Sequence, residues 1–143
     1  MNKLMLIGST GSGKTTLCQV LHDMNIQYKK TQAVEYFDYT IDTPGEYIEN
    51  RAYYRALIVA STECDVVGLV QDSTLEASFF PPGFASIFAK PVIGVVTKKD
   101  RSSEEEIKRA EEFLEDAGAQ IIFKISSVNG DGIGRLKDYL TSL

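Results

Sequence analysis

The stretch that constrains this chain most is residues 8–15, which read G-S-T-G-S-G-K-T and match the pattern G-x-x-x-x-G-K-[ST] at every fixed position. Three glycines let the backbone turn until successive N–H groups converge on one point. A helix that begins near Lys14 adds its positive end there. Convergent amides attract an anion, so the loop predicts a phosphate site. The alternative is a Gly/Ser/Thr-rich turn that happens to precede a lysine.

The residues on either side of this loop favour the phosphate site. The apolar run over residues 3–7 is typical of a buried strand. After the loop, apolar residues recur with the spacing of one helix face, at Leu17, Val20, Leu21 and Met24. Strand, loop and helix therefore follow one another in the order that a phosphate loop requires.

Within the loop, the side chains and amides have distinct expected roles. Lys14 is a catalytic candidate because its ammonium can reach the β- and γ-phosphates of a nucleotide. The Thr15 hydroxyl is placed to coordinate Mg²⁺ directly. The residues expected to bind the phosphates are Gly8, Ser9, Gly11, Ser12, Gly13, Lys14, Thr15 and Thr16.

Composition narrows the classes of partner. With 143 residues the chain is expected to form a single domain over residues 1–143, and its formal net charge of −5 argues against nucleic acid or an anionic membrane as the main partner. No apolar stretch approaches a membrane span, and the run at the start is too short for a signal peptide. Cys18 and Cys64 lack metal-binding spacing and are expected to be buried small hydrophobes in a reducing cytoplasm.

Apolar runs further along the chain predict the sheet. Strands are expected over residues 36–41, 65–71, 91–97 and 121–125. Continuous β-branched runs suit parallel strands that are covered on both faces. The alternation of strands and helices predicts a three-layer α/β/α sandwich with a mostly parallel, doubly wound sheet, whose ligand lies at the carboxyl ends of the strands.

Apolar spacing and caps predict the helices. Residues 51–64 are helical in pattern, with Leu57 and Ile58 expected in the core. The next helix is capped by Ser102 or Ser103 and ends at Gly118. Core-facing residues of this helix and of the closing helix are expected to be Ile107, Ala110, Phe113, Leu114, Ala117, Ile133, Leu136 and Leu140.

One loop has two open interpretations. Residues 79–84 read F-F-P-P-G-F, and the prolines prevent regular strand pairing. The aromatic residues either form a docking surface flanked by rigid prolines or pack into the core.

A second strand-end signal is D-x-x-G at residues 42–45. The Asp42 carboxylate can hold Mg²⁺ through a water, and the N–H of Gly45 can meet a γ-phosphate. This loop would then sense whether that phosphate is present. Alone the pattern is also compatible with an ordinary turn that closes a strand.

A third signal, T-K-K-D at residues 97–100, predicts which nucleotide base the site selects. The Asp100 carboxylate can accept hydrogen bonds from N1–H and N2–H₂ of guanine, whereas adenine offers an acceptor at N1 and no N2 amine. Thr97 and Lys98 complete the expected base site, with the Lys98 stem along the base plane. The alternative is a charged loop before a helix.

Ser126 and Ser127 follow the last strand, where a backbone N–H could bind guanine O6. The match to the S-A-x signal of GTPases is loose, because Ser127 replaces the usual alanine. An ordinary serine-rich loop is an equal alternative.

Together these motifs resemble a small Ras-like or Era-like P-loop GTPase. The chain is more similar to the GTPase-like PduV/EutP family of ethanolamine and propanediol utilisation, and the resemblance covers nearly the whole chain. It is carried by residues 8–15, 30–33, 42–47, 80–84 and 97–100. The resemblance implies a cytoplasmic role in catabolism of a short amino alcohol or diol, with a bacterial microcompartment shell protein or a pathway enzyme as partner.

The resemblance assigns roles to residues outside the loop. Thr31 is the candidate for the threonine that completes the Mg²⁺ shell and takes part in catalysis, or else is an ordinary loop threonine. Glu46 holds the position where Ras-type enzymes place a water-orienting glutamine. Because a carboxylate cannot donate to the γ-phosphate, slow hydrolysis is expected. Arg51 or Arg55 is either an internal arginine finger or a surface salt-bridge partner.

The spacing also departs from the Ras-like pattern. About thirty-four positions separate Gly8 from Asp42, which leaves room for a clipped edge hairpin or none in the second-strand region.

Three functions remain open at this point. The first is a Mg²⁺-dependent GTP/GDP switch or slow GTPase. The second is a phosphotransferase that uses ATP and a short-chain carboxylate such as acetate. The third is a non-catalytic module that holds a nucleotide and docks to an enzyme or shell protein. The sequence leaves the oligomeric state open.

Overall fold

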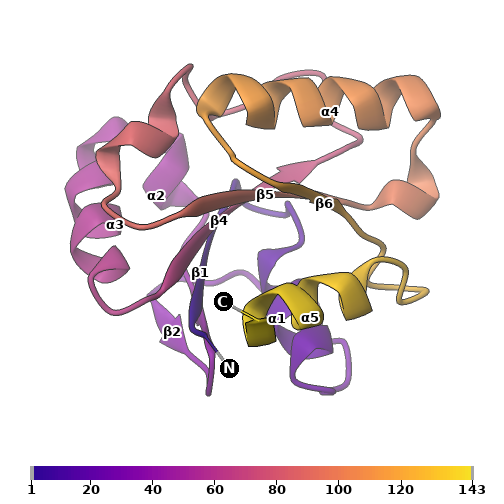
Figure 1. The fold of residues 1–143 in the computed structure, drawn as a ribbon, viewed down its shortest axis with the longest axis horizontal. Coiled ribbons are helices and arrows are strands. Elements are labelled where there is room, and N and C mark those ends of the chain that lie inside the picture. The colour runs from indigo at the N-terminus through magenta and orange to yellow at the C-terminus, as the bar shows by residue number, and fades with distance from the viewer. Residues whose placement is uncertain (1, 143) are drawn as a thin grey trace.

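The backbone forms a six-stranded sheet with helices on both faces (Figure 1). The computed structural model describes residues 2–142. The strands are β1 (Leu4–Ile7), β2 (Glu35–Tyr36), β3 (Thr40–Asp42), β4 (Val66–Asp72), β5 (Val92–Thr97) and β6 (Ile122–Lys124). Their order in the sheet is β2-β3-β1-β4-β5-β6.

Every pairing in this sheet is parallel except that between β2 and β3. The carboxyl ends of β1, β3, β4 and β5 therefore lie along one edge. In such a sheet the crevice at that edge is the usual place for a ligand.

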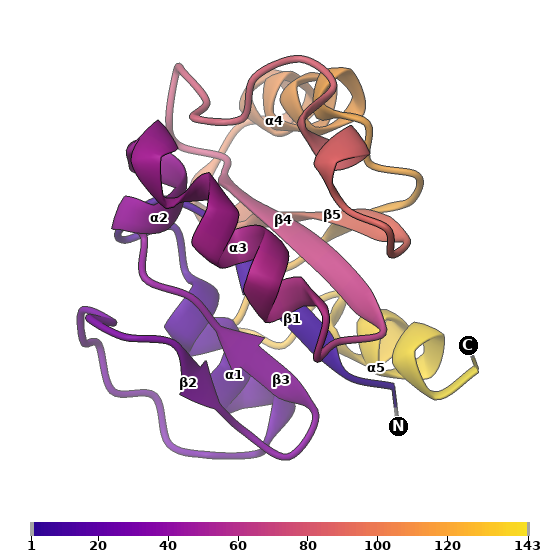
Figure 2. The same cartoon turned by 90° about the vertical axis from the view of Figure 1, so that its left-hand side faces the viewer.

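Within residues 2–142 the strands are accompanied by five helices and three short 3₁₀ turns, and α5 follows the last strand. The helices are α1 (Lys14–Leu21), α2 (Glu46–Glu49), α3 (Tyr54–Ser61), α4 (Glu104–Ala117) and α5 (Ile133–Ser142). The 3₁₀ turns are η1 (Arg51–Tyr53), η2 (Phe84–Ile87) and η3 (Lys99–Arg101). Figure 2 shows α3 in front of the sheet, over β1 and between β3 and β4, with α2 beside its first turn.

Alternate side chains of β1 enter two different cores. Met5 and Ile7 lie in the core covered by α3 and α4, whereas Leu4 and Leu6 lie in the core covered by α1 and α5. This alternation is the period of a strand with both faces buried. The predicted three-layer α/β/α sandwich is confirmed.

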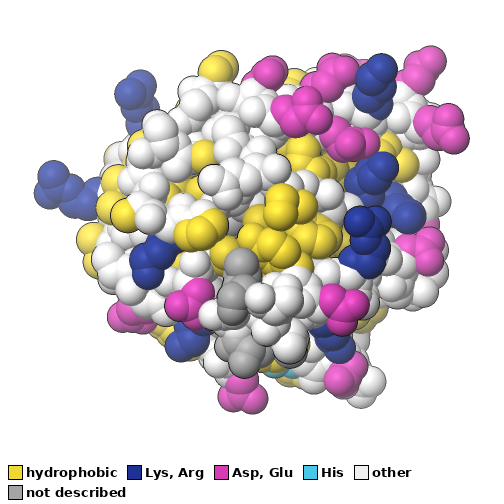
Figure 3. Space-filling view, viewed as in Figure 1, with side chains coloured by type: hydrophobic (Ala, Val, Ile, Leu, Met, Phe, Trp, Pro, Cys, Tyr) yellow, Lys and Arg dark blue, Asp and Glu magenta, His cyan; other side chains and the backbone are white. Residues whose placement is uncertain are grey.

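The predicted cap of α4 is present in full. The Ser103 side chain accepts from the Glu106 N–H, the Glu106 carboxylate accepts from the Ser103 N–H, and Gly118 ends the helix with a φ of 102°. The acidic first turn faces solvent. Figure 3 shows Asp and Glu side chains gathered over α4, with exposed hydrophobic side chains between α4 and α5.

The predicted strand over residues 36–41 is wrong as a single element. The chain turns back on itself within it, and the Phe37 N–H donates to the Thr40 carbonyl at 2.8 Å. β2 and β3 are the two arms of this turn, paired in antiparallel fashion. The clipped edge hairpin expected in the shortened second-strand region is therefore confirmed.

One helix boundary and one expected core residue also differ from expectation. α1 ends at Leu21, so Met24 lies beyond it and is 49% exposed. In α3, Leu57 is fully buried but Ile58 is 40% exposed, because the next residue along a helix points about 100° away.

The aromatic loop over residues 79–84 packs mainly inward. Phe80 and Phe84 are buried in the core with α3 and α4, while Phe79 is half-exposed. Both cysteines are buried and free, as expected.

Between residues 2 and 142, no helix is long and apolar enough to cross a membrane.

Leu57 and Ile58 provide a matched test of the packing of α3. Leu57→Ala should lower the free energy of unfolding by about 3 kcal/mol, because it leaves a cavity in the core. Ile58→Ala should lower it by about 0.5 kcal/mol, as at other surface positions. Urea denaturation measures both, and equal losses would contradict the packing described here.

Candidate functional site

A cavity of about 490 Å³ opens at the carboxyl edge of the sheet. Four segments line it: the phosphate loop with the start of α1, the loop before β2, the turn after β3, and the loop after β5. The lining residues are Thr10, Gly11, Gly13, Lys14, Thr15, Thr16, Tyr28, Lys29, Lys30, Thr31, Gly45, Lys98 and Arg101. The cavity thus contains both the predicted phosphate loop and part of the predicted base site.

The phosphate loop has the backbone that its glycines predict. Gly13 caps α1 with a φ of 104°, a left-handed conformation that disfavours any side chain. Lys14 is the first residue of α1 and is buried, with its ammonium donating to the Ser9 carbonyl at 3.2 Å. Burial lowers the pKa of Lys14, and the charge of Asp42 opposes that effect. The loop therefore holds a buried cation at the amino end of a helix.

Thr15, Thr31 and Asp42 come together beside this loop, and we call them the oxygen triad. Both threonine hydroxyl groups donate to Oδ2 of Asp42, at 2.5 Å from Thr15 and 2.9 Å from Thr31. The two hydroxyl oxygens are 2.6 Å apart. Three oxygen atoms thus make three short contacts with only two hydroxyl hydrogens between them. A proton on Asp42 or a cation among the oxygens would relieve the repulsion.

The other Asp42 oxygen supports the same conclusion. Asp42 is fully buried, and its Oδ1 has no hydrogen-bond partner among the described residues. Burial raises the pKa of this carboxyl group, against the lowering effect of the Thr15 hydrogen bond. Hydroxyl and carboxylate oxygens are ligands that Mg²⁺ prefers. Within residues 2–142 no group of three His, Cys, Asp or Glu residues forms a metal site of another kind.

Two hydrogen bonds attach the loop after β5 to the phosphate loop. The Thr97 hydroxyl donates to the Ser12 carbonyl at 2.5 Å, and the Lys98 ammonium donates to the Gly11 carbonyl at 2.8 Å. Lys98 adopts a left-handed backbone with a φ of 61°. The predicted base site is thus held directly against the predicted phosphate site.

Asp72, at the end of β4, is a residue that the sequence reasoning missed. Its carboxylate lies 2.7 Å from the Lys98 ammonium and also accepts from the N–H and hydroxyl of Thr74. Because Asp72 is buried at the end of β4, this ion pair holds the Lys98 side chain between the ends of β4 and β5. The polar residues that end an otherwise apolar strand were the only signal for it in the sequence.

Four predicted base-site residues do not line the cavity: Thr97, Asp100, Ser126 and Ser127. Asp100 is exposed on η3, just beyond Lys98. Ser126 is buried, and its N–H donates to the Asp131 carbonyl at 2.9 Å. Ser127 follows it, partly buried, in the turn that leads to α5.

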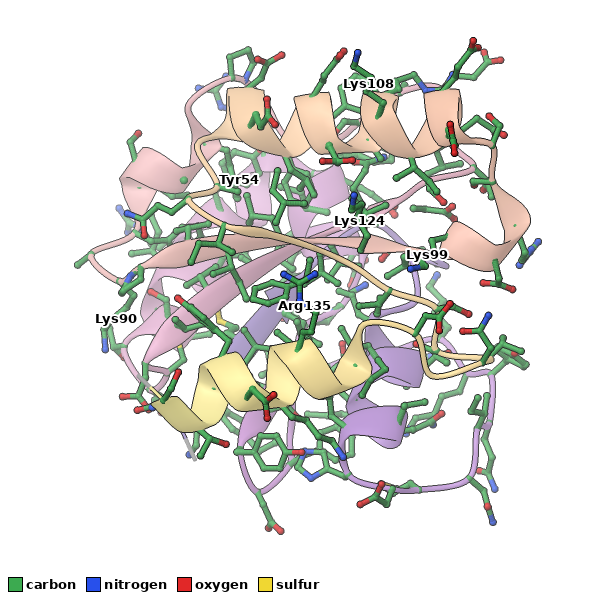
Figure 4. The ribbon with its side chains drawn as sticks, turned by 45° about the vertical axis from the view of Figure 1, so that its right-hand side comes forward. Tyr54, Lys90, Lys99, Lys108, Lys124 and Arg135 are labelled. Atoms are coloured by element: carbon green, nitrogen blue, oxygen red, sulfur yellow. The ribbon has the colours of Figure 1, made fainter. Side chains whose placement is uncertain are left out.

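The turn that carries Ser126 and Ser127 packs on the loop after β5. The Lys99 N–H donates to the Ile125 carbonyl at 3.1 Å, and the Lys99 ammonium is 3.9 Å from the Asp131 carboxylate. Figure 4 shows Lys99 beside this turn. The two loops predicted to read the base are therefore neighbours.

The region after Gly45 differs most from expectation. Glu46 begins α2 but is exposed and does not line the cavity. Glu49, which was not singled out, accepts a hydrogen bond from the Thr10 N–H at 2.6 Å. Arg51 and Arg55 are exposed, and neither lines the cavity or forms an ion pair with a described residue. The arginine at the cavity is Arg101.

The fold and the phosphate loop define a P-loop NTPase-like α/β protein. The structure resembles a bacterial selenocysteine-specific elongation factor EF-Sec, with a TM-score of 0.71, 25% identity, and coverage of 99% of this chain and 28% of that one. It also resembles the elongation factor SelB from Methanococcus maripaludis in complex with the GTP analogue GppNHp, with a TM-score of 0.67, 25% identity, and coverage of 99% and 33%. The chain spans about a third or less of these factors.

The chain belongs to the PduV-EutP family, described as ethanolamine utilisation and propanediol utilisation, whose model matches residues 1–142. It is 41% identical to the propanediol utilization protein PduV of Citrobacter freundii, over 99% of this chain and 95% of that protein. It is 34% identical to a "Probable acetate kinase EutP" of Escherichia coli strain K12, over 100% of this chain and 91% of that protein. The family resemblance seen in the sequence is confirmed.

Asp42 can be tested without any ligand. Burial raises the pKa of Asp42 in the folded state, so the ionised carboxylate costs stability above its unfolded pKa. This cost shrinks as the pH falls below the folded pKa and is absent below the unfolded pKa. Asp42→Asn should therefore raise the stability of the metal-free protein at pH 7 by about 1 kcal/mol. The gain should shrink in acid.

Thermal unfolding in EDTA at several pH values measures this difference. Asp38→Asn, at an exposed position before β3, is the control and should leave stability unchanged. A loss of stability in Asp42→Asn at neutral pH would contradict this account, because it would show that the hydrogen bonds to the Asp42 carboxylate outweigh the cost of burying its charge.

Proposed function

We propose that the protein is a Mg²⁺-dependent GTP/GDP-binding switch, or slow GTPase, that acts in ethanolamine or propanediol utilisation. The observation that carries this proposal is the oxygen triad beside the phosphate loop, where a buried carboxylate oxygen lacks a partner among the described residues. The likeness to elongation factors, one of them in complex with a GTP analogue, supports guanine as the base.

In this proposal the chain holds the phosphates and the metal with separate groups. Loop amides and the Lys14 ammonium would bind the phosphate oxygens, since Lys14 begins α1 and lines the cavity together with the loop. Thr15, Thr31 and Asp42 would hold Mg²⁺, Asp42 through a water. The ion, when bound, neutralises charge on the β- and γ-phosphates. Gly45 offers its N–H to the terminal phosphate at the cavity wall.

The base is selected by the loop after β5. Lys98, fixed by Asp72 and Gly11, lays its methylene stem along the base plane. Asp100, exposed and two residues further on, accepts from N1–H and N2–H₂ of guanine. The Ser126 N–H already donates to the Asp131 carbonyl, so Ser127 in the same turn would supply the contact at O6. Tyr28 and Arg101 lie at the cavity and add an aromatic ring and a cation to its wall.

Unaided hydrolysis is slow in this proposal. Glu46 is exposed away from the cavity, and a carboxylate can orient a water but cannot donate to the γ-phosphate. The output is a change in the loops around Thr31 and Glu46 when the terminal phosphate is lost. A pathway enzyme or microcompartment shell protein in the cytoplasm would detect that change, as membership of the family suggests.

A second candidate function comes from the name of a relative. The E. coli relative is called a probable acetate kinase, which suggests transfer of phosphate from ATP to acetate. Formation of acetyl phosphate that depends on both ATP and acetate would favour this function over a GTP switch. Retention of nucleotide without any turnover would instead favour a docking module.

Base selection gives the decisive test. Wild-type protein should bind GDP with Mg²⁺ and resist displacement by ADP. Asp100→Ala should weaken GDP binding roughly 100-fold, because guanine loses two hydrogen bonds to a charged acceptor, while ADP binding stays the same. Competition against a fluorescent GDP analogue measures both affinities.

Asp116→Ala removes an exposed carboxylate from α4 and serves as the control. If ADP binds as tightly as GDP, or if Asp100→Ala behaves like the control, guanine selection by this loop is refuted.

A further inference from the structure

Glu49 reaches from the end of α2 to the phosphate loop. Its Oε2 accepts from the Thr10 N–H at 2.6 Å, across 39 positions of sequence. Thr10 lines the cavity, so the carboxylate is bound to an amide of the phosphate loop at the cavity. Such a charge-assisted bond to a backbone N–H is what a phosphate oxygen would make in the same place.

The groups around this contact belong to the terminal-phosphate end of the proposed site. Gly45 lies so close to Thr10 that a Cβ on Gly45 would be 2.2 Å from the Thr10 nitrogen. Burial lowers the pKa of Lys14, and the charge of Glu49 is among those that oppose this lowering, after Asp42 and Cys18. The carboxylate therefore lies near the amide and the ammonium that the terminal phosphate would use.

A carboxylate and a terminal phosphate cannot both occupy this place. The Thr10 N–H has one hydrogen to donate, and two anions at the same amide repel each other. In the proposed site a diphosphate would end before this subsite and would leave the Glu49 contact intact.

We propose that Glu49 is an internal competitor of the terminal phosphate and thereby sets the preference of the site between nucleoside diphosphate and triphosphate. This inference rests on the proposed function. Triphosphate binding expels the Glu49 carboxylate from Thr10, and the diphosphate state restores it. Glu49 ends α2, and Ile48 anchors that helix in the core. Release of Glu49 by a terminal phosphate therefore removes a hydrogen bond that holds the end of α2 against the phosphate loop.

Glu49→Gln tests this role with little change in shape. The variant removes the competing charge, so affinity for a non-hydrolysable GTP analogue should rise roughly three- to tenfold while affinity for GDP stays the same. Isothermal titration calorimetry in Mg²⁺ measures both. Glu112→Gln removes an exposed glutamate of α4 and should change neither affinity.

A second variant and a second readout keep the test decisive. Glu49→Ala should shift the ratio of affinities in the same direction. In NMR spectra of wild-type protein, the Thr10 amide signal should move on replacing GDP by the GTP analogue and should already be shifted in Glu49→Gln.

The outcomes separate the inference from the proposed function. If GDP and the analogue both bind but Glu49→Gln leaves their ratio at the wild-type value, the role of Glu49 is refuted and the nucleotide site stands. If wild-type protein binds neither nucleotide, the proposed function fails and the competition fails with it.

Discussion

The rest of the site depends on how the buried carboxylate of Asp42 is stabilised. One of its oxygens accepts hydrogen bonds from two threonine hydroxyl groups, and the other has no hydrogen-bond partner among the described residues. A charge in such a place is stabilised by a proton or by a cation. In the proposed function a metal ion bound with a nucleotide would supply that cation.

The topology of the sheet brings the necessary groups to one edge. The phosphate loop follows β1, Asp42 ends β3, Asp72 ends β4 and Thr97 ends β5. Because these four strands are adjacent and parallel, the groups at their ends meet although they are far apart in the sequence. The bonds from Thr97 and Lys98 to the phosphate loop then fix the distance between phosphate and base sites.

The sequence predicted the features that depend on residues close together in the chain. The phosphate loop, the Ser103 cap and the buried strands around β4 and β5 all follow from local patterns. Thr31 was placed with Asp42 only as an expectation from family resemblance. Asp72 and Glu49 were missed because their partners lie 26 and 39 positions away. Ile58 was assigned to the core because a helical pattern does not fix which of two adjacent apolar residues faces inward.

The central claim is that the oxygen triad is a metal site completed by a nucleotide. It is tested most directly by the affinity for a non-hydrolysable GTP analogue, measured by calorimetry with Mg²⁺ and again with EDTA. The account predicts that Mg²⁺ tightens binding to wild-type protein by roughly tenfold or more, and that Asp42→Asn loses most of this gain. Equal affinities with and without Mg²⁺ in the wild-type protein would contradict it.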